Sequence, residues 1–149
     1  MMSVHVAAKG FEENGELRLE LVESASHAVL EAEKSQDPGR VDIVLGDDPL
    51  LEHLNRTFRG RQGPTDVISF ELEADEDAGD DLVGEIYLSL DRARAQAADY
   101  DATLQEEVAR LVIHGTLHVL GYDHQEPDER RVMEERERTH MGSWKASLR

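Results

Sequence analysis

The stretch that most constrains the fold is residues 104–120, which is apolar on nearly every side when it is placed on a helix. Val108, Leu111 and Leu117 fall on different sides of such a helix, so none of its sides is suited to water. The pattern therefore predicts a central, buried helix that other elements cover. Since 149 residues is the size of one ordinary domain, we expect a single domain, residues 1–149, built around this helix.

The rest of the chain alternates between short strands and amphipathic helices. Four segments rich in β-branched and aromatic residues predict strands, namely SVHVA, VDIVLG, DVISFEL and LVGEIYLS. The last two are separated by an acidic loop and predict an antiparallel pair. Further helices are expected over residues 16–35 and over residues 128–140. Another is expected to begin at an N-cap at Asp47 and to end at Gly60, and a fourth to run from an N-cap at Asp91 to Tyr100.

Composition narrows the possible functions. The chain has no cysteine, so a transition-metal site must be built from imidazole and carboxylate groups. A formal net charge of -17 repels nucleic acid at long range, and a polyanionic substrate would need a local basic patch. No run approaches the roughly 20 apolar residues of a membrane span, and the N-terminus lacks the pattern of a signal peptide. We expect a soluble, cytoplasmic protein without membrane association.

The segment HGTLHVLGYDH, residues 114–124, has the spacing of a metal site. His114 and His118 are four residues apart, so a helix places both imidazoles on one face, one turn apart. Gly121 can end that helix in a left-handed conformation and let His124 return toward the first two. Three protein ligands leave one coordination position open, which is the arrangement of catalytic rather than structural zinc.

The same spacing, HxxxHxxGxxH, occurs in the metzincin peptidases, so a zinc peptidase is an alternative. In those enzymes the residue after the first histidine is a glutamate that acts as the general base. Here that residue is Gly115, which has no side chain to move a proton. The sequence therefore argues against peptide hydrolysis by that route.

The zinc motif HGTLHVLGYDH resembles that of the YbeY family, bacterial endoribonucleases involved in ribosomal RNA maturation, and differs from the family pattern only at Val119. Two further segments are similar to the family, LNRTFRGRQGPTDVISFE from Leu54 to Glu71 and LVGEIYLS. The resemblance implies an α+β fold with a mixed, roughly four-stranded sheet covered by about five helices. It also implies zinc bound by His114, His118 and His124, and an essential arginine that corresponds to Arg59.

The activity implied by the resemblance is metal-dependent cleavage of single-stranded RNA in ribosomal RNA processing, with the ribosome or ribosomal proteins as expected partners. Arg59 and His114 are the candidate catalytic residues. Two other classes of function stay open, a metal-dependent hydrolase such as a peptidase, and a ribosome-associated factor whose zinc is structural. Imidazole also binds nickel, copper and iron, and the sequence leaves both the ion and the oligomeric state open.

Several residues near these motifs are candidates for supporting roles. Arg56, Arg59 and Arg61 form a dense basic cluster in an acidic chain, suited to a phosphate backbone, although Arg56 and Arg61 fit a solvated turn equally well. Because side chains alternate along a strand, Val67 and Ser69 are expected on one face of the sheet and Ile68 and Phe70 on the other. A cleft wall is expected to include Thr65, Asp66 and Ser69, and a structural role is expected for Asp123. No general base is evident.

Overall fold

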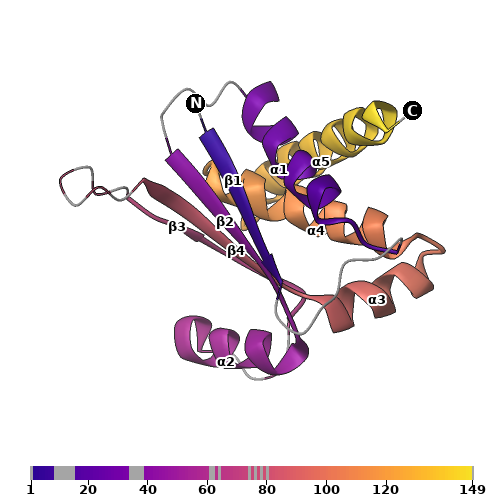
Figure 1. Cartoon of the computed structure of the whole chain (residues 1–149), viewed down its shortest axis with the longest axis horizontal. Helices are drawn as coiled ribbons and strands as arrows, with labels where there is room; N and C mark the ends of the chain where they lie inside the picture. Colours follow the sequence, from indigo (N-terminus) through magenta and orange to yellow (C-terminus); the bar gives the residue numbers. More distant parts are fainter. Residues whose placement is uncertain are drawn as a thin grey trace.

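The computed structural model describes residues 2–8, 16–33, 39–60, 63, 65–73, 75, 77, 79 and 81–148. These residues form an α+β structure with five helices and one four-stranded sheet (Figure 1). In chain order the elements are β1 (Met2–Ala8), α1 (Leu19–Ala32), β2 (Gly39–Gly46), α2 (Asp48–Arg59), β3 (Val67–Glu71), β4 (Leu82–Ser89), α3 (Leu90–Asp99), α4 (Leu104–Val119) and α5 (Pro127–Ser147). The fold class predicted from the sequence is confirmed.

The sheet is mixed, with the strand order β1-β2-β4-β3. β1 pairs with β2 and β2 pairs with β4 in parallel, whereas β3 and β4 form the predicted antiparallel pair with Ser69 opposite Ile86. Parallel neighbours need a crossover connection, and α1 lies within the connection from β1 to β2. β3 is consequently an edge strand, and one of its two sides is not paired with another strand of the sheet.

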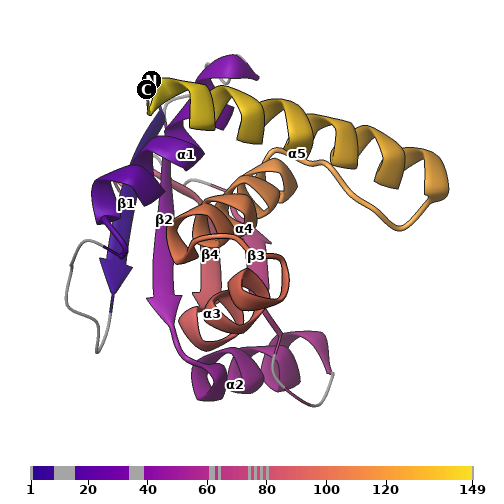
Figure 2. The ribbon, with the colours of Figure 1, turned by 90° about the vertical axis from the view of Figure 1, so that its right-hand side faces the viewer.

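The two faces of the sheet are covered by different helices. In Figure 2 α1 and α4 lie in front of the strands, whereas Figure 1 shows α2 on the opposite side of the sheet. α1 and α4 contribute most of the helical residues of the main core, which also contains Trp144 from α5. On the other face, Leu51 and Leu54 of α2 form a smaller cluster with Ile68. Val67 packs on the main core and Ile68 on the smaller cluster, which confirms the alternation expected for β3.

Helix α4 is mostly buried and contacts α1, α3, α5, β3 and β4. It begins with a capping box, in which the Thr103 hydroxyl accepts from the Glu106 amide and the Glu106 carboxylate accepts from the Thr103 amide. It ends, as predicted, before Gly121, whose φ is 101°. The amide of Gly121 donates to the carbonyl of His118, and that of Tyr122 donates to Leu117, which is a Schellman motif.

Three predicted helix boundaries are wrong. α1 begins at Leu19 rather than residue 16, because the Arg18 backbone is extended and its amide donates to the Gln105 side chain. Residues 34 and 35 of that expected helix lie outside the described part of the chain. Ser89, not Asp91, caps α3, and the Asp91 carboxylate instead accepts from the Asp48 amide. α5 continues to Ser147, beyond the predicted residue 140, because it carries the buried side chain of Trp144.

Among the described residues, no helix combines the length and the apolar character that crossing a membrane requires.

Candidate active site

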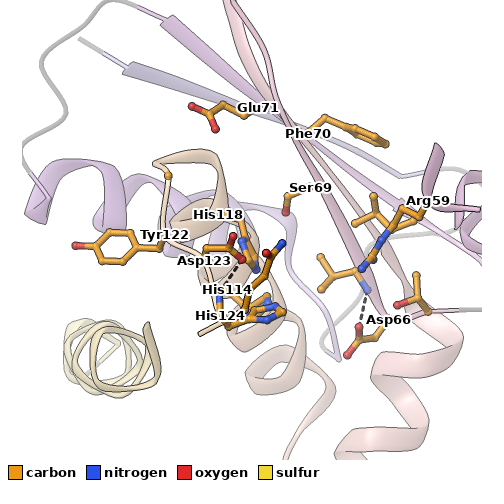
Figure 3. Close-up of a pocket in the computed structure, with 15 residues that line it drawn as sticks. Arg59, Asp66, Ser69, Phe70, Glu71, His114, His118, Tyr122, Asp123 and His124 are labelled. Carbon is orange, nitrogen blue, oxygen red and sulfur yellow. Dashed lines mark hydrogen bonds between the residues drawn. The ribbon is translucent and has the colours of Figure 1, made fainter. Parts of the chain in front are cut away.

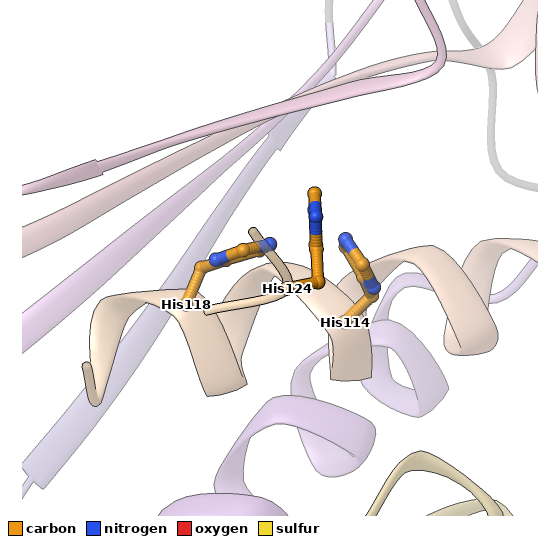
Figure 4. A group of neighbouring side chains, drawn as sticks. All are labelled: His114, His118 and His124. Atoms are coloured by element: carbon orange, nitrogen blue, oxygen red, sulfur yellow. The ribbon is translucent and has the colours of Figure 1, made fainter. Parts of the chain in front are cut away.

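The three histidines of the motif come together at the C-terminal end of α4 (Figure 4). The ring centroids of His114 and His118 are 4.7 Å apart, and that of His124 is 5.6 Å from the first and 4.9 Å from the second. Each residue offers one nitrogen, and the three nitrogens lie within 4.8 Å of one another. Imidazole nitrogens bind zinc at about 2.0–2.1 Å, so the cluster is compact enough to hold one metal ion.

The loop that returns His124 to the helix is held at several points. Gly121 has nothing within 4 Å of the place where a Cβ would sit, so its requirement for glycine comes from its positive φ. The Asp123 carboxylate accepts a 2.7 Å hydrogen bond from the His124 amide, which supports the structural role expected for Asp123. The Tyr122 hydroxyl donates to Glu33 at the end of α1, at 2.7 Å. The ligand loop is therefore attached to the body of the protein.

Electrostatics favour the neutral form of His118. Burial lowers the pKa of this imidazole, and the neighbouring His114 and His124 lower it further. A metal ion binds the deprotonated nitrogen of imidazole, so a lowered pKa leaves His118 available as a ligand near neutral pH.

A carboxylate from a distant helix contacts the first histidine. Glu137 of α5 bonds to Nδ1 of His114, and the two side chains are only 18% and 24% exposed. A bond at Nδ1 leaves Nε2 of the same ring as the atom that can face a metal ion. Glu137 is not among the residues predicted from the sequence, because α5 is rich in exposed acidic residues and no spacing marks this one. Only the packing of α5 against α4 identifies it.

The histidines open into a cavity of about 580 Å³ (Figure 3). Its other wall is the edge strand β3 and the residues before it, and Thr65, Asp66 and Ser69 line it as expected. Asp66 is held in place, since its carboxylate accepts from the Val67 amide at 2.8 Å and from the Gln96 side chain at 3.2 Å. In Figure 3 Ser69 lies on the histidine side of the strand.

The free edge of β3 presents backbone donors to this cavity. The carbonyl of Asp66 accepts from the Ser89 amide, and the Leu72 amide donates to the Val83 carbonyl. In an antiparallel pair such residues alternate with residues whose amide and carbonyl point away from the partner strand. The amides of Ser69 and Glu71 therefore point out of the sheet, along a strand that lines the cavity.

Arg59 lines the same cavity, at the end away from the histidines (Figure 3). It lies in the last turn of α2, directly before Gly60, whose φ of 64° ends the helix. Within the described residues, no carboxylate forms an ion pair with Arg59, so its guanidinium is available to an anion. Arg56 differs, because it pairs with Glu52 at 3.2 Å and does not line the cavity. Arg61 lies outside the described residues.

The family model for "Endoribonuclease YbeY" matches residues 8–145 of this chain. The chain belongs to the YbeY family. The endoribonuclease YbeY of Pelotomaculum thermopropionicum is 40% identical over 126 residues, which are 82% of this chain and 83% of that protein. The endoribonuclease YbeY of Carboxydothermus hydrogenoformans is 44% identical over 99 residues, 66% of this chain and 68% of that protein.

The fold of this YbeY family member is also found in a solved structure. The solution structure of TM1509 from Thermotoga maritima matches with a TM-score of 0.61 and 28% sequence identity, over 99% of this chain and 93% of that one. The family predicted from the histidine motif is thus confirmed, and its relatives are named for endoribonuclease activity. The alternatives of a peptidase and of a structural zinc factor are not favoured.

The surroundings of Gly115 in this YbeY chain strengthen the case against a peptidase. A Cβ at Gly115 would lie 2.8 Å from Ile86 Cγ2 and 2.9 Å from Ser69 Oγ. Position 115 therefore faces the sheet at very close range, and a glutamate there would require Ile86, Ser69 or α4 itself to shift. The glycine is explained by helix-to-sheet packing, which the sequence alone could not show.

Proposed function

We propose that this chain is a metal-dependent endoribonuclease specific for single-stranded RNA, with zinc bound by His114, His118 and His124. The observation that carries the proposal is a cavity with a compact histidine cluster at one end and, at the other, Arg59, which no carboxylate of the described residues pairs with. The first suits a metal ion, and the second suits the phosphate backbone of a nucleic acid. The family's endoribonucleases supply the reaction class.

In this proposal the residues that line or support the cavity have different roles. His114, His118 and His124 would hold the metal ion, which when bound would supply a Lewis acid for a phosphoryl oxygen and for water. Arg59 presents a fork of donors to a phosphate and stabilises the charge that grows on its oxygens during cleavage. The outward amides of Ser69 and Glu71 are further donors for the backbone of a strand that lies along β3. Glu137 orients His114.

Two carboxylates of the cavity have positional roles. Both oxygens of Asp66 accept hydrogen bonds that fix the start of β3. Asp123 accepts from the His124 amide and so shapes the ligand loop. We therefore assign neither of them to proton transfer.

The proposed setting is the processing of ribosomal RNA during ribosome maturation in the cytoplasm. The net charge of -17 supports a substrate that is presented by a partner, because long-range repulsion disfavours tight binding of free RNA. A ribosome or ribosomal protein that brings the strand to the cavity would offset this repulsion. Local contacts at Arg59 then need only to position the phosphate.

The test is cleavage of a labelled single-stranded RNA and of the matched duplex, measured while zinc is titrated into metal-free protein. We expect zinc-dependent cleavage of the single strand, and a fall in rate of about a hundredfold or more for Arg59→Ala and for His118→Ala. Arg56→Ala is the matched control, since Arg56 lies on the same helix but outside the cavity, and it should cleave like the wild type.

Contaminating ribonuclease would respond to none of these substitutions. Undiminished cleavage by both Arg59→Ala and His118→Ala would rule out the proposed active site. Cleavage of casein but not of RNA would instead point to a peptidase.

A further inference from the structure

One aromatic side chain beside the cavity is largely exposed to water. Phe58, in the last turn of α2, is 63% exposed and directly precedes Arg59 in the sequence. Single exposed hydrophobic side chains are common on protein surfaces and need no explanation by themselves. Two features distinguish Phe58. A second aromatic ring, Phe70, holds it, and it is followed in the sequence by Arg59, which forms no ion pair within the described part of the chain.

The ring of Phe58 is the outermost member of a row of three aromatic rings. Its centroid is 5.3 Å from that of Phe70 with an interplanar angle of 74°, and Phe70 is 5.9 Å from Tyr87 at 80°. Edge-to-face contacts of this kind are favourable and orient the rings they join. Phe70, the middle ring of the row, also lines the cavity, so it joins the exposed ring of Phe58 to the cavity wall.

The combination of a held, exposed aromatic ring and a cavity-lining guanidinium matches the two parts of a nucleotide, the base and the phosphate. Unpaired bases stack on aromatic side chains, and arginine binds the phosphates between them. The bases of a duplex have their faces covered by neighbouring base pairs, so such a ring favours a single strand. In Figure 3 Phe70 and Arg59 lie on the same side of β3, away from the histidines.

We propose that Phe58 is a stacking platform for one unpaired nucleobase of the RNA, next to the nucleotide whose phosphate contacts Arg59. The strand would cross the edge of β3, with the bond to be cleaved at the histidine end of the cavity and the stacked base beyond Arg59. This inference rests on the proposed function. It adds a subsite that selects single strands through the base rather than through the phosphate.

The first experiment compares steady-state cleavage of a single-stranded RNA by three variants at the solvent-exposed aromatic positions. Phe58→Ala should raise KM at least about fivefold, which is the lower end of what the loss of one base–aromatic contact costs. Phe58→Trp should keep KM near the wild-type value, because it retains a ring that can stack. Tyr100→Ala is the matched control, since Tyr100 is 76% exposed on the C-cap of α3 and does not line the cavity.

The second experiment separates stacking from electrostatics. An oligonucleotide with abasic sites in place of the bases keeps its phosphates, and Phe58→Ala should bind it as well as the wild type does. The salt dependence of binding should become shallower in Arg59→Ala, which loses a phosphate contact, and stay unchanged in Phe58→Ala.

The outcomes distinguish the two proposals. Suppose that the wild type cleaves RNA, that the Arg59 and His118 variants do not, and that Phe58→Ala has the same KM as Tyr100→Ala. The stacking platform is then wrong, and the proposed function stands. An equal loss of affinity for normal and abasic strands in Phe58→Ala would also overturn it. If the wild type neither binds nor cleaves single-stranded RNA, the proposed function fails and the platform fails with it.

Discussion

At the scale of single residues, the candidate ligands depend on side chains that hold them in place. Tyr122 attaches the ligand loop to Glu33, and Arg136 lies 3.8 Å from the same carboxylate. Glu137 bonds to His114 from α5. Such supporting groups fix the orientation of an imidazole before the ion arrives, so less ordering is needed on binding.

The contact of Glu137 with His114 leads to a prediction about metal affinity. Glu137→Gln removes the negative charge beside the ring while it keeps the shape of the side chain. We expect the affinity for zinc to fall about ten- to a hundredfold, which is typical when the hydrogen-bond partner of a ligand histidine is changed. Competition with a chromophoric chelator measures the affinity directly, without reference to activity.

The matched control for this variant is Glu134→Gln, because Glu134 is an exposed glutamate of the same helix, whereas the carboxylate that bonds to His114 is that of Glu137. Its zinc affinity should equal that of the wild type. Equal affinities for the two variants would show that Glu137 does not support His114.

At the scale of elements, the site depends on how closely α4 approaches the sheet. A Cβ at Gly84 of β4 would lie 2.5 Å from Val119 Cγ1, and one at Gly115 of α4 would lie 2.8 Å from Ile86 Cγ2. Each of the two elements thus has a glycine where the other comes nearest. This close contact sets the distance between the histidines on α4 and the cavity wall formed by β3.

Gly115→Ala tests this approach through stability. Alanine is favoured over glycine inside a helix by up to about 1 kcal/mol. The new methyl group would overlap Ile86 and Ser69, however, and overpacking of a tight core costs about 1–3 kcal/mol. We expect a net fall in the free energy of unfolding, measured by urea denaturation.

Gly142→Ala is the control for helix propensity alone. Gly142 lies in α5 and has no atom within 4 Å of the place where a Cβ would sit. This substitution should stabilise the protein by up to about 1 kcal/mol. If Gly115→Ala stabilised the protein to the same extent, the close contact of α4 with the sheet would be disproved.

At the scale of the whole molecule, the hydrophobic core and the histidine cluster are separate. The main core joins α1, α4, α5 and three strands through buried hydrophobic side chains. His114 and His118 are half-buried and His124 is exposed, so none of the three belongs to that core. The fold therefore has its own source of stability, unlike small zinc domains that are unfolded without metal.

Removal of the metal should consequently leave the protein folded. We expect chelation to preserve the far-ultraviolet circular dichroism spectrum and cooperative thermal unfolding, with a lower Tm. Zinc at about 100 times its Kd should restore roughly 2.7 kcal/mol, because only the folded state has the assembled site. Loss of the helical signal on chelation would support the structural-zinc alternative instead.

The sequence by itself determined the features that depend on neighbouring positions. The helical period brings His114 and His118 to one face, and Gly121 with its positive φ ends the helix where the pattern predicts. Alternation correctly divides Val67 from Ile68, and the hairpin of β3 and β4 follows from two apolar runs and the loop between them. Backbone geometry repeats over a few residues, so such patterns can be read without the fold.

Only the tertiary structure decided which side chains meet across elements. Glu137 reaches His114 because α5 packs against α4, and Arg59 shares a cavity with the histidines because α2 ends beside the edge strand β3. The sequence shows only that Gly115 stands where metzincin peptidases have a catalytic glutamate. The structure shows that this glycine lies where α4 closely approaches the sheet. These contacts depend on the packing of segments far apart in the chain, which local periodicity does not contain.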